Sequence, residues 1–174
     1  SNLAFHSIMQ DRMGFLWIGT ENGLHRHDGH SFKVYRNNPN DSTSLFNNWI
    51  RDHIVEDFRG DLWMKTGKGI CRFDRKTETF QRFPADHPLS NANSIMSNQI
   101  IADTANSIWF VQQDDLRPFT STLVRYNIKR DTCIIFDVPA EIDGFFKEGV
   151  TRIAGIDGQS AVLQTYWGGL VRLD

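Results

Sequence analysis

A group of three histidines is the part of the sequence whose types and spacing best suit chemistry. His25 and His27 would project from the same face of a strand, and His30 follows them, a spacing compatible with a metal site. Asp114 and Asp115 are adjacent carboxylates, but both lie in one segment without a convincing acid–base partner. The sequence has no glycine-rich phosphate loop and no nucleophile elbow. We therefore expect no catalytic residue and no cofactor, and so no enzyme activity in this chain.

The segments that must position these side chains repeat along the sequence. The pattern Asp-x-x-Gly-x-Leu-Trp-x-x-Thr-x-x-Gly-[Leu/Ile]-x-Arg-x-Asp occurs at 11–28 and again at 57–74, a spacing of 46 residues. A third copy keeps this spacing to Trp109 and resumes at Leu123 after an insertion of seven residues, whereas a weaker fourth copy has Leu163 instead of the tryptophan. A residue needed once in every copy is expected to be structural. The recurring residues are Asp11, Gly14, Trp17, Gly23, Arg26, Asp57, Gly60, Trp63, Gly69, Arg72, Asp103, Trp109, Arg125, Asp157, Gly169 and Arg172.

Each copy is expected to form four short antiparallel strands. In the first copy the second to fourth strands would be 15–20, 24–28 and 31–35, with Asp and Gly at the turns between them. Four strands in about 46 residues fit one blade of a β-propeller. The predicted fold is therefore all-β, an incomplete and open β-propeller of about four tandem four-stranded antiparallel blades, in one domain over 1–174. The expected blades are 1–36, 48–84, 97–137 and a truncated 149–174.

The repeat favours packing roles for the histidines and cysteines. The positions equivalent to His25 and His27 are Cys71 and Phe73 in the second copy, which are typical of a sheet interior, so no metal site is expected. Cys71 and Cys133 are the two cysteines, and without a Cys-x-x-Cys pair they do not indicate zinc. We expect both to be buried free thiols rather than a disulfide.

Composition excludes several classes of function. The 174 residues carry a net charge of -2, which gives no positive field to attract nucleic acid. No apolar run approaches the length of a membrane span. Five tryptophans and thirteen phenylalanines indicate sheets packed on sheets. Because the sequence opens on Ser1 and not on methionine, we expect a piece of a longer protein.

The repeat resembles that of two-component regulator propellers. The segments Ser7-Ile-Met-Gln-Asp-Arg12 and Asp28-Gly-His-Ser-Phe-Lys-Val-Tyr-Arg36 are similar to the start of the periplasmic sensor of hybrid two-component systems in gut Bacteroidetes. The resemblance covers nearly the whole chain and is weakest in the fourth copy.

The resemblance implies a role in sensing oligosaccharides to control polysaccharide-utilisation genes. Such proteins carry two propellers, a β-sandwich, a membrane helix, a histidine kinase, a receiver and a helix-turn-helix domain. The partners of this chain would then be an oligosaccharide, the remaining blades and the sensor domains that follow. The location would be periplasmic, in a parent anchored in the inner membrane, and this fragment would contact neither membrane nor nucleic acid.

The ligand face of such a propeller is predicted from the alternation of strand direction. The loops between second and third strands share one face with the connectors between copies, and all long segments fall there, namely 36–48, 84–98, 112–122 and 137–149. Loops on a rigid scaffold preferentially carry function. Sugars bind to aromatic faces together with amides, carboxylates and arginines. The candidates that interrupt the repeat are Trp49, Arg51, Gln112, Gln113, Asp114, Asp115, Arg117, Tyr166 and Trp167.

Other functions remain open from the sequence. Trp49 and Trp167 would be structural if they packed between blades, and the chain would then be a scaffold propeller without a ligand of its own. A propeller-type lyase with a metal on its axis is a further alternative. The open ends of an incomplete propeller would also expose apolar faces and an unpaired edge, which predicts a homo-oligomer.

Overall fold

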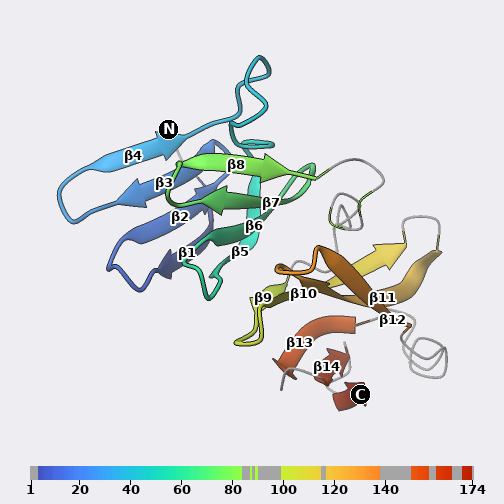
Figure 1. The fold of residues 1–174 in the computed structure, drawn as a ribbon. Coiled ribbons are helices and arrows are strands. Elements are labelled where there is room, and N and C mark those ends of the chain that lie inside the picture. Colours follow the sequence, from blue (N-terminus) through green and yellow to red (C-terminus); the bar gives the residue numbers. More distant parts are fainter. Residues whose placement is uncertain are drawn as a thin grey trace. The chain divides into compact units, whose positions relative to one another are not determined.

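The computed structural model contains strands and no helix among the residues that it describes (Figure 1). Those residues are 4–83, 87, 89, 99–114, 117–137, 150–156, 160–165 and 170–173. The chain separates into two compact units, Ser1–Asn93 and Ser94–Asp174, and each is considered by itself. No helix in the described part of the chain could cross a membrane.

The first unit holds two four-stranded antiparallel sheets. One sheet consists of β1 (Phe5–Gln10), β2 (Leu16–Thr20), β3 (Gly23–His27) and β4 (Phe32–Tyr35). The other consists of β5 (Ile50–Glu56), β6 (Leu62–Thr66), β7 (Gly69–Asp74) and β8 (Thr79–Arg82). In both sheets each strand pairs with its neighbour in sequence, which is the meander expected for a propeller blade.

The second unit repeats the same order of strands. Its four-stranded sheet consists of β9 (Ile100–Ala102), β10 (Ser107–Asp114), β11 (Arg117–Asn127) and β12 (Thr132–Asp137). Its three-stranded sheet consists of β13 (Val150–Ile156), β14 (Ala161–Thr165) and β15 (Leu170–Leu173). The fold is thus all-β with several antiparallel meanders, as the repeat predicts.

The insertion in the third copy differs from its prediction. Instead of a loop over 112–122, it lengthens the hairpin of β10 and β11, where Gln112 pairs with Thr122 and Gln113 with Ser121. The register then shifts before Asp114 pairs with Arg117. Threonine and phenylalanine are enriched in strands, and residues added to both arms of a hairpin can continue its ladder.

The fourth copy also departs from the repeat. Leu163 is fully buried, like the tryptophans of the other copies. However, Arg172 is exposed and pairs with Val162, whereas the repeat would place it opposite Leu163. A slip of one residue moves a side chain to the other face of a sheet, so Arg172 does not stand beside Leu163 as Arg26 stands beside Trp17.

One apolar layer joins the two sheets of the first unit. Trp17 and Leu24 from the first sheet are fully buried, as are Leu62 and Phe73 from the second. Trp17 meets Phe73 edge-on, with ring centroids 5.2 Å apart. Stacking the sheets therefore buries faces that one sheet alone would expose, which is the physical reason for the repeat.

The connector between these sheets is held in place, although its sequence is polar. Leu45 is fully buried in the apolar layer. The Phe80 N–H donates to the Thr43 carbonyl at 2.7 Å, and the Arg82 side chain donates to the Ser44 and Leu45 carbonyls. The connector therefore packs along β8 and delivers the chain to the start of β5 at a fixed position.

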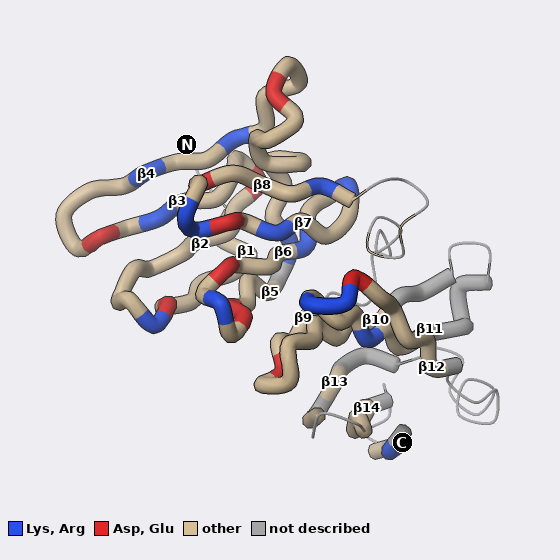
Figure 2. The backbone as a smooth tube through the Cα atoms, in the orientation of Figure 1, with Lys and Arg blue, Asp and Glu red and all other residues tan. Residues whose placement is uncertain are grey.

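Charged residues are interspersed over the described strands. Figure 2 shows basic and acidic residues mixed along the backbone of β1 to β8. The mixture agrees with the small net charge of -2.

Candidate functional site

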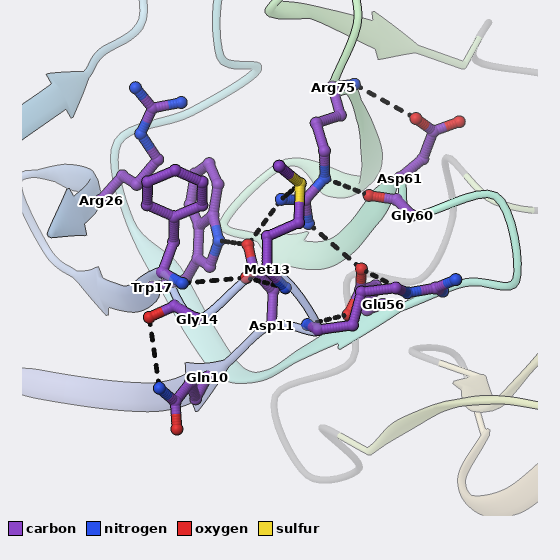
Figure 3. Close-up of polar contacts among 12 residues, drawn as sticks. Gln10, Asp11, Met13, Gly14, Trp17, Arg26, Glu56, Gly60, Asp61 and Arg75 are labelled. Carbon is purple, nitrogen blue, oxygen red and sulfur yellow. Dashed lines mark hydrogen bonds and ion pairs between the residues drawn. The ribbon is translucent and has the colours of Figure 1, made fainter. Parts of the chain in front are cut away.

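The repeated aspartate organises the turn between the first two strands of a blade. In the first blade, Asp11 Oδ1 accepts the N–H groups of Met13 and Phe15 at 2.9 and 3.0 Å. Asp11 Oδ2 accepts the Trp17 indole N–H at 2.6 Å (Figure 3). The same indole contact recurs from Trp63 to Asp57 at 2.9 Å and from Trp109 to Asp103 at 2.8 Å.

The repeated tryptophan also has a constant set of neighbours. It stacks on an aromatic ring near the end of the fourth strand, and the repeated arginine lies over its ring. The stacked pairs are Trp17–Tyr35, Trp63–Phe83 and Trp109–Phe136, with centroids 6.0, 5.9 and 5.7 Å apart. The arginines over the rings are Arg26, Arg72 and Arg125. The repeated aspartates, tryptophans and arginines therefore contact one another and stabilise the packing of the blades.

An arginine outside the repeat links the two blades of the first unit. Arg75 donates to Asp11 Oδ2 at 2.5 Å and to the Gly60 carbonyl at 2.6 Å, and pairs with Glu56 at 3.3 Å (Figure 3). Arg12 pairs with Glu56 from the other side at 2.9 Å. Burial raises the pKa of Asp11, but the hydrogen bonds from Trp17 and Arg75 outweigh it and lower that pKa below its ordinary value.

A glutamate in the turn between β7 and β8 makes a second link. Glu78 has a left-handed φ of 54° and bonds to Arg26 at 2.8 Å, to Lys33 and to the Tyr35 hydroxyl. The hydrogen bond from Lys33 is the main reason that the pKa of Glu78 is lowered. Asp131 takes the same left-handed conformation, with φ 54°, in the equivalent turn of the second unit.

The opposite ends of these blades carry the predicted ligand face. The Gly23 N–H donates to the Asn48 carbonyl at 2.8 Å, and the Gly67 N–H donates to the Trp49 carbonyl at 2.9 Å. Gly23 begins the third strand of its blade and Gly67 lies in the loop between β6 and β7, whereas Asn48 and Trp49 end the connector. The expectation that these loops share one face is therefore confirmed in the first unit.

Trp49 is an exposed aromatic ring on this face. Its exposed fraction is 42%, whereas the three repeated tryptophans are completely buried. The Arg51 guanidinium lies over the ring, 4.0 Å from its centroid. The His6 ring is 6.5 Å away and tilted by 55°. The structure thus brings two of the predicted ligand residues together and adds a histidine that the repeat did not single out.

Irregular pairing in strands β1 and β5 positions the His6 and Arg51 side chains. The register of β1 shifts between Phe5 and Ser7, so that His6 is the extra residue of a bulge. The register of β5 shifts between Arg51 and Ile54. Bulges redirect side chains and are frequent beside functional sites. A proline or glycine signal in the sequence does not mark either bulge, which explains why His6 could not be found from the pattern.

The other predicted ligand residues lie in the second unit or outside the described residues. Gln112, Gln113, Asp114 and Arg117 are in the β10–β11 hairpin, and only their backbone is described. Asp115, Tyr166 and Trp167 lie outside the described residues, as do the repeat residues Asp157 and Gly169. The ligand role of this whole set stays a prediction.

Of the histidines and cysteines singled out by the sequence, Cys71 is buried, whereas His30 is exposed. His25 and His27 are partly buried on β3, and the His27 ring lies 4.4 Å from that of Phe32. Both cysteines are free. Cys71 is buried, and burial raises the pKa of its thiol to about 12. Cys133 is only partly buried, so the expectation of full burial is wrong there. Among the side chains that are described, no three His, Cys, Asp or Glu residues cluster as metal ligands would.

Comparisons with known proteins agree with the repeat. Residues 1–22 match the model of the two component regulator propeller family. A histidine kinase of Formosa agariphila, called P4, is 63% identical over 38 residues, which make up 22% of this chain and 3% of the kinase.

Solved structures extend the likeness to nearly the whole chain. An extracellular domain of a putative hybrid two component system of B. thetaiotaomicron matches 98% of this chain with a TM-score of 0.71 and 20% identity. A second such domain from this bacterium matches all of the chain, with a TM-score of 0.56 and 20% identity. This chain spans 22% and 29% of those two chains. The resemblance to two-component regulator propellers is confirmed, and the fold is that of an open β-propeller.

Proposed function

We propose that this chain is part of the extracytoplasmic sensor region of a hybrid two-component system and that it binds an oligosaccharide. The observation that carries the proposal is the match of 98% of the chain to an extracellular domain of such a system. The location would be periplasmic, and signalling would depend on kinase and output domains elsewhere in the parent protein. The chain itself contributes recognition and not catalysis.

The proposed contact with the ligand is the face that carries Trp49. An exposed indole beside an arginine offers an apolar surface for a sugar ring and donors for its hydroxyl groups. The connector packed along β8 holds Trp49 in place before any ligand arrives, and such preorganisation reduces the entropic cost of binding.

We also propose that the blades span 1–36, 48–84, 97–137 and 149–174 of one propeller domain, and that another blade covers the free face of the first. Ile8, Phe32 and Val34 are 69, 60 and 37% exposed there. The equivalent face of the second blade packs its Leu62 and Phe80 against the first. The covering blade belongs either to the parent chain or to a second copy, and light scattering of the purified chain distinguishes a monomer from a dimer.

A calorimetric titration tests recognition. The intact extracytoplasmic region would be titrated with the oligosaccharide that an array of glycans identifies. We expect Trp49→Ala to weaken binding about tenfold, because a stacked ring contributes up to about 1.5 kcal/mol and about 1.4 kcal/mol corresponds to a tenfold change in affinity. Phe58→Ala is the matched control, since Phe58 is 43% exposed at the opposite end of β5. Equal affinity of both variants would favour a scaffold propeller.

A further inference from the structure

Two polar atoms beside Trp49 lack the partners that burial demands. Arg51 Nε and His6 Nε2 are both buried atoms, and neither forms a hydrogen bond. Buried polar groups in folded proteins are nearly always hydrogen-bonded, so each exception calls for an explanation. These two atoms lie on residues that both contact the same exposed indole.

Two basic residues lie near the indole. Arg51 lies over its ring, and Lys65 stands opposite Arg51 in the β5–β6 ladder. Among the side chains that are described, no carboxylate pairs with Arg51. Glu21 is 3.4 Å from His6 Nε2 as an ion pair but forms no hydrogen bond with it, and its side chain is 59% exposed.

The arginines at the other end of the same blades differ in this respect. Arg75 pairs with Asp11 and Glu56, and Arg12 also pairs with Glu56. Arg51 thus differs from Arg12 and Arg75, because it stacks on an exposed indole and no carboxylate among the described side chains pairs with it.

We propose that the Trp49 site binds an anionic sugar, with Arg51 and His6 donating to its carboxylate or sulfate and Trp49 packing against its ring. Hydrogen bonds between an arginine and an anion are about twice as strong as those between neutral groups. An oxyanion supplies the negative charge and the acceptor that no described side chain gives Arg51, and it accepts from His6 Nε2 when that nitrogen carries a proton. The proposal rests on the proposed sensing of oligosaccharides and adds the charge of the ligand.

An array of oligosaccharides tests the charge. The intact extracytoplasmic region would be applied to uronate-containing, sulfated and neutral oligosaccharides of matched length. Binding confined to the anionic glycans supports the proposal, and the uronate and sulfate groups identify which oxyanion is preferred. Binding to neutral glycans alone would overturn it and leave the sensing function in place. Binding to none of the glycans would overturn both proposals.

Variants and salt locate the effect. Arg51→Gln should weaken binding of an anionic glycan at least tenfold, whereas Arg59→Gln should not. Arg59 is the matched control because it is exposed and also lies over an aromatic ring, 5.3 Å from the centroid of Phe58. The affinity of the unmodified protein should also fall as salt rises from about 0.05 to about 0.5 M. The distance over which exposed charges interact shortens from about 10 Å near 0.1 M salt to about 3 Å near 1 M. Affinity unchanged by both salt and Arg51→Gln would overturn the proposal, as would a structure of the intact region in which a carboxylate of the protein itself occupies the site.

Discussion

The two ends of the β5 strand differ in how their polar groups are satisfied. At the end that follows Glu56, the aspartate and arginine side chains are bonded to each other, to backbone groups and to the tryptophan indole. At the end that begins with Trp49, an indole is exposed, and two buried side-chain nitrogens, Arg51 Nε and His6 Nε2, form no hydrogen bond. The first arrangement obeys the repeat and the second interrupts it. The difference leads us to expect that stability depends mainly on the first end, and it supports the proposal that the second end binds a ligand.

The largest expected effect is at the repeated tryptophan. Trp17→Ala should lower the free energy of unfolding by about 3–5 kcal/mol, because it removes a fully buried ring and leaves a cavity between the blades. Denaturant-induced unfolding measures the change. Phe32→Ala is the control, since Phe32 is 60% exposed and its loss should cost less than about 1 kcal/mol. Similar losses in both variants would contradict the assignment of stability to the tryptophan layer.

The ion pair between the blades should have the next largest effect. Arg75→Met leaves the buried Asp11 carboxylate without its cation, which costs about 3 kcal/mol. Because the pKa of Asp11 is lowered in the folded state, its contribution is present above the unfolded value near 4 and is lost as pH falls through the folded value. The difference in stability between the unmodified protein and the variant should therefore narrow as pH falls below about 4. A difference that stays constant from pH 7 to pH 2 would rule out this linkage.

Two glycines separate backbone strain from a steric clash. A Cβ at Gly23 would lie 2.4 Å from the Tyr35 carbonyl oxygen at φ +115°, whereas at Gly29, with φ +97°, it would meet nothing within 4 Å. Gly29→Ala should cost about 1–2 kcal/mol from the conformation alone. Gly23→Ala should cost about 1 kcal/mol more, because the carbonyl must also move. Thermal unfolding shows which of the two variants is less stable. Equal losses of stability would mean that the backbone around Gly23 relaxes and removes the clash.

The smallest change in stability is expected at the ligand face. Trp49→Ala should lower the free energy of unfolding by only about 1 kcal/mol, since the residue is 42% exposed and lies outside the core of the first unit. Chemical denaturation of this variant beside Trp17→Ala gives the sharpest form of the comparison. A loss as large as that of Trp17→Ala would make Trp49 a structural residue.

The sequence predicts the strands well because each blade pairs only with itself. Asp11, Gly14 and Trp17 belong to one hairpin, so a local pattern is enough to place them. The partners that join two blades are less accessible to such reasoning. Arg75 and Glu78 contact residues of the preceding blade, and they do not recur in the repeat.

The ligand face is predictable only in part. Trp49 and Arg51 were found because they stand beside a connector, whereas His6 reaches the same place through a bulge in a strand of the other blade. A bulge depends on how two strands compete for register, and a pattern of residue types does not encode it here. The prediction of a loop over 112–122 is wrong for a related reason. A hairpin can lengthen into a segment whose residue types are typical of a loop.

The order in which strands pair has a consequence for synthesis of the chain. Strands β1 to β4 pair in a sheet only with one another, so this sheet can form once Tyr35 has left the ribosome. Its tryptophan layer is different, because Phe73 and Phe80, which cover Trp17 and Tyr35, are made later. A nascent first blade would therefore expose an apolar face until its neighbour arrives, and pauses in translation between residues 35 and 80 should increase its capture by chaperones.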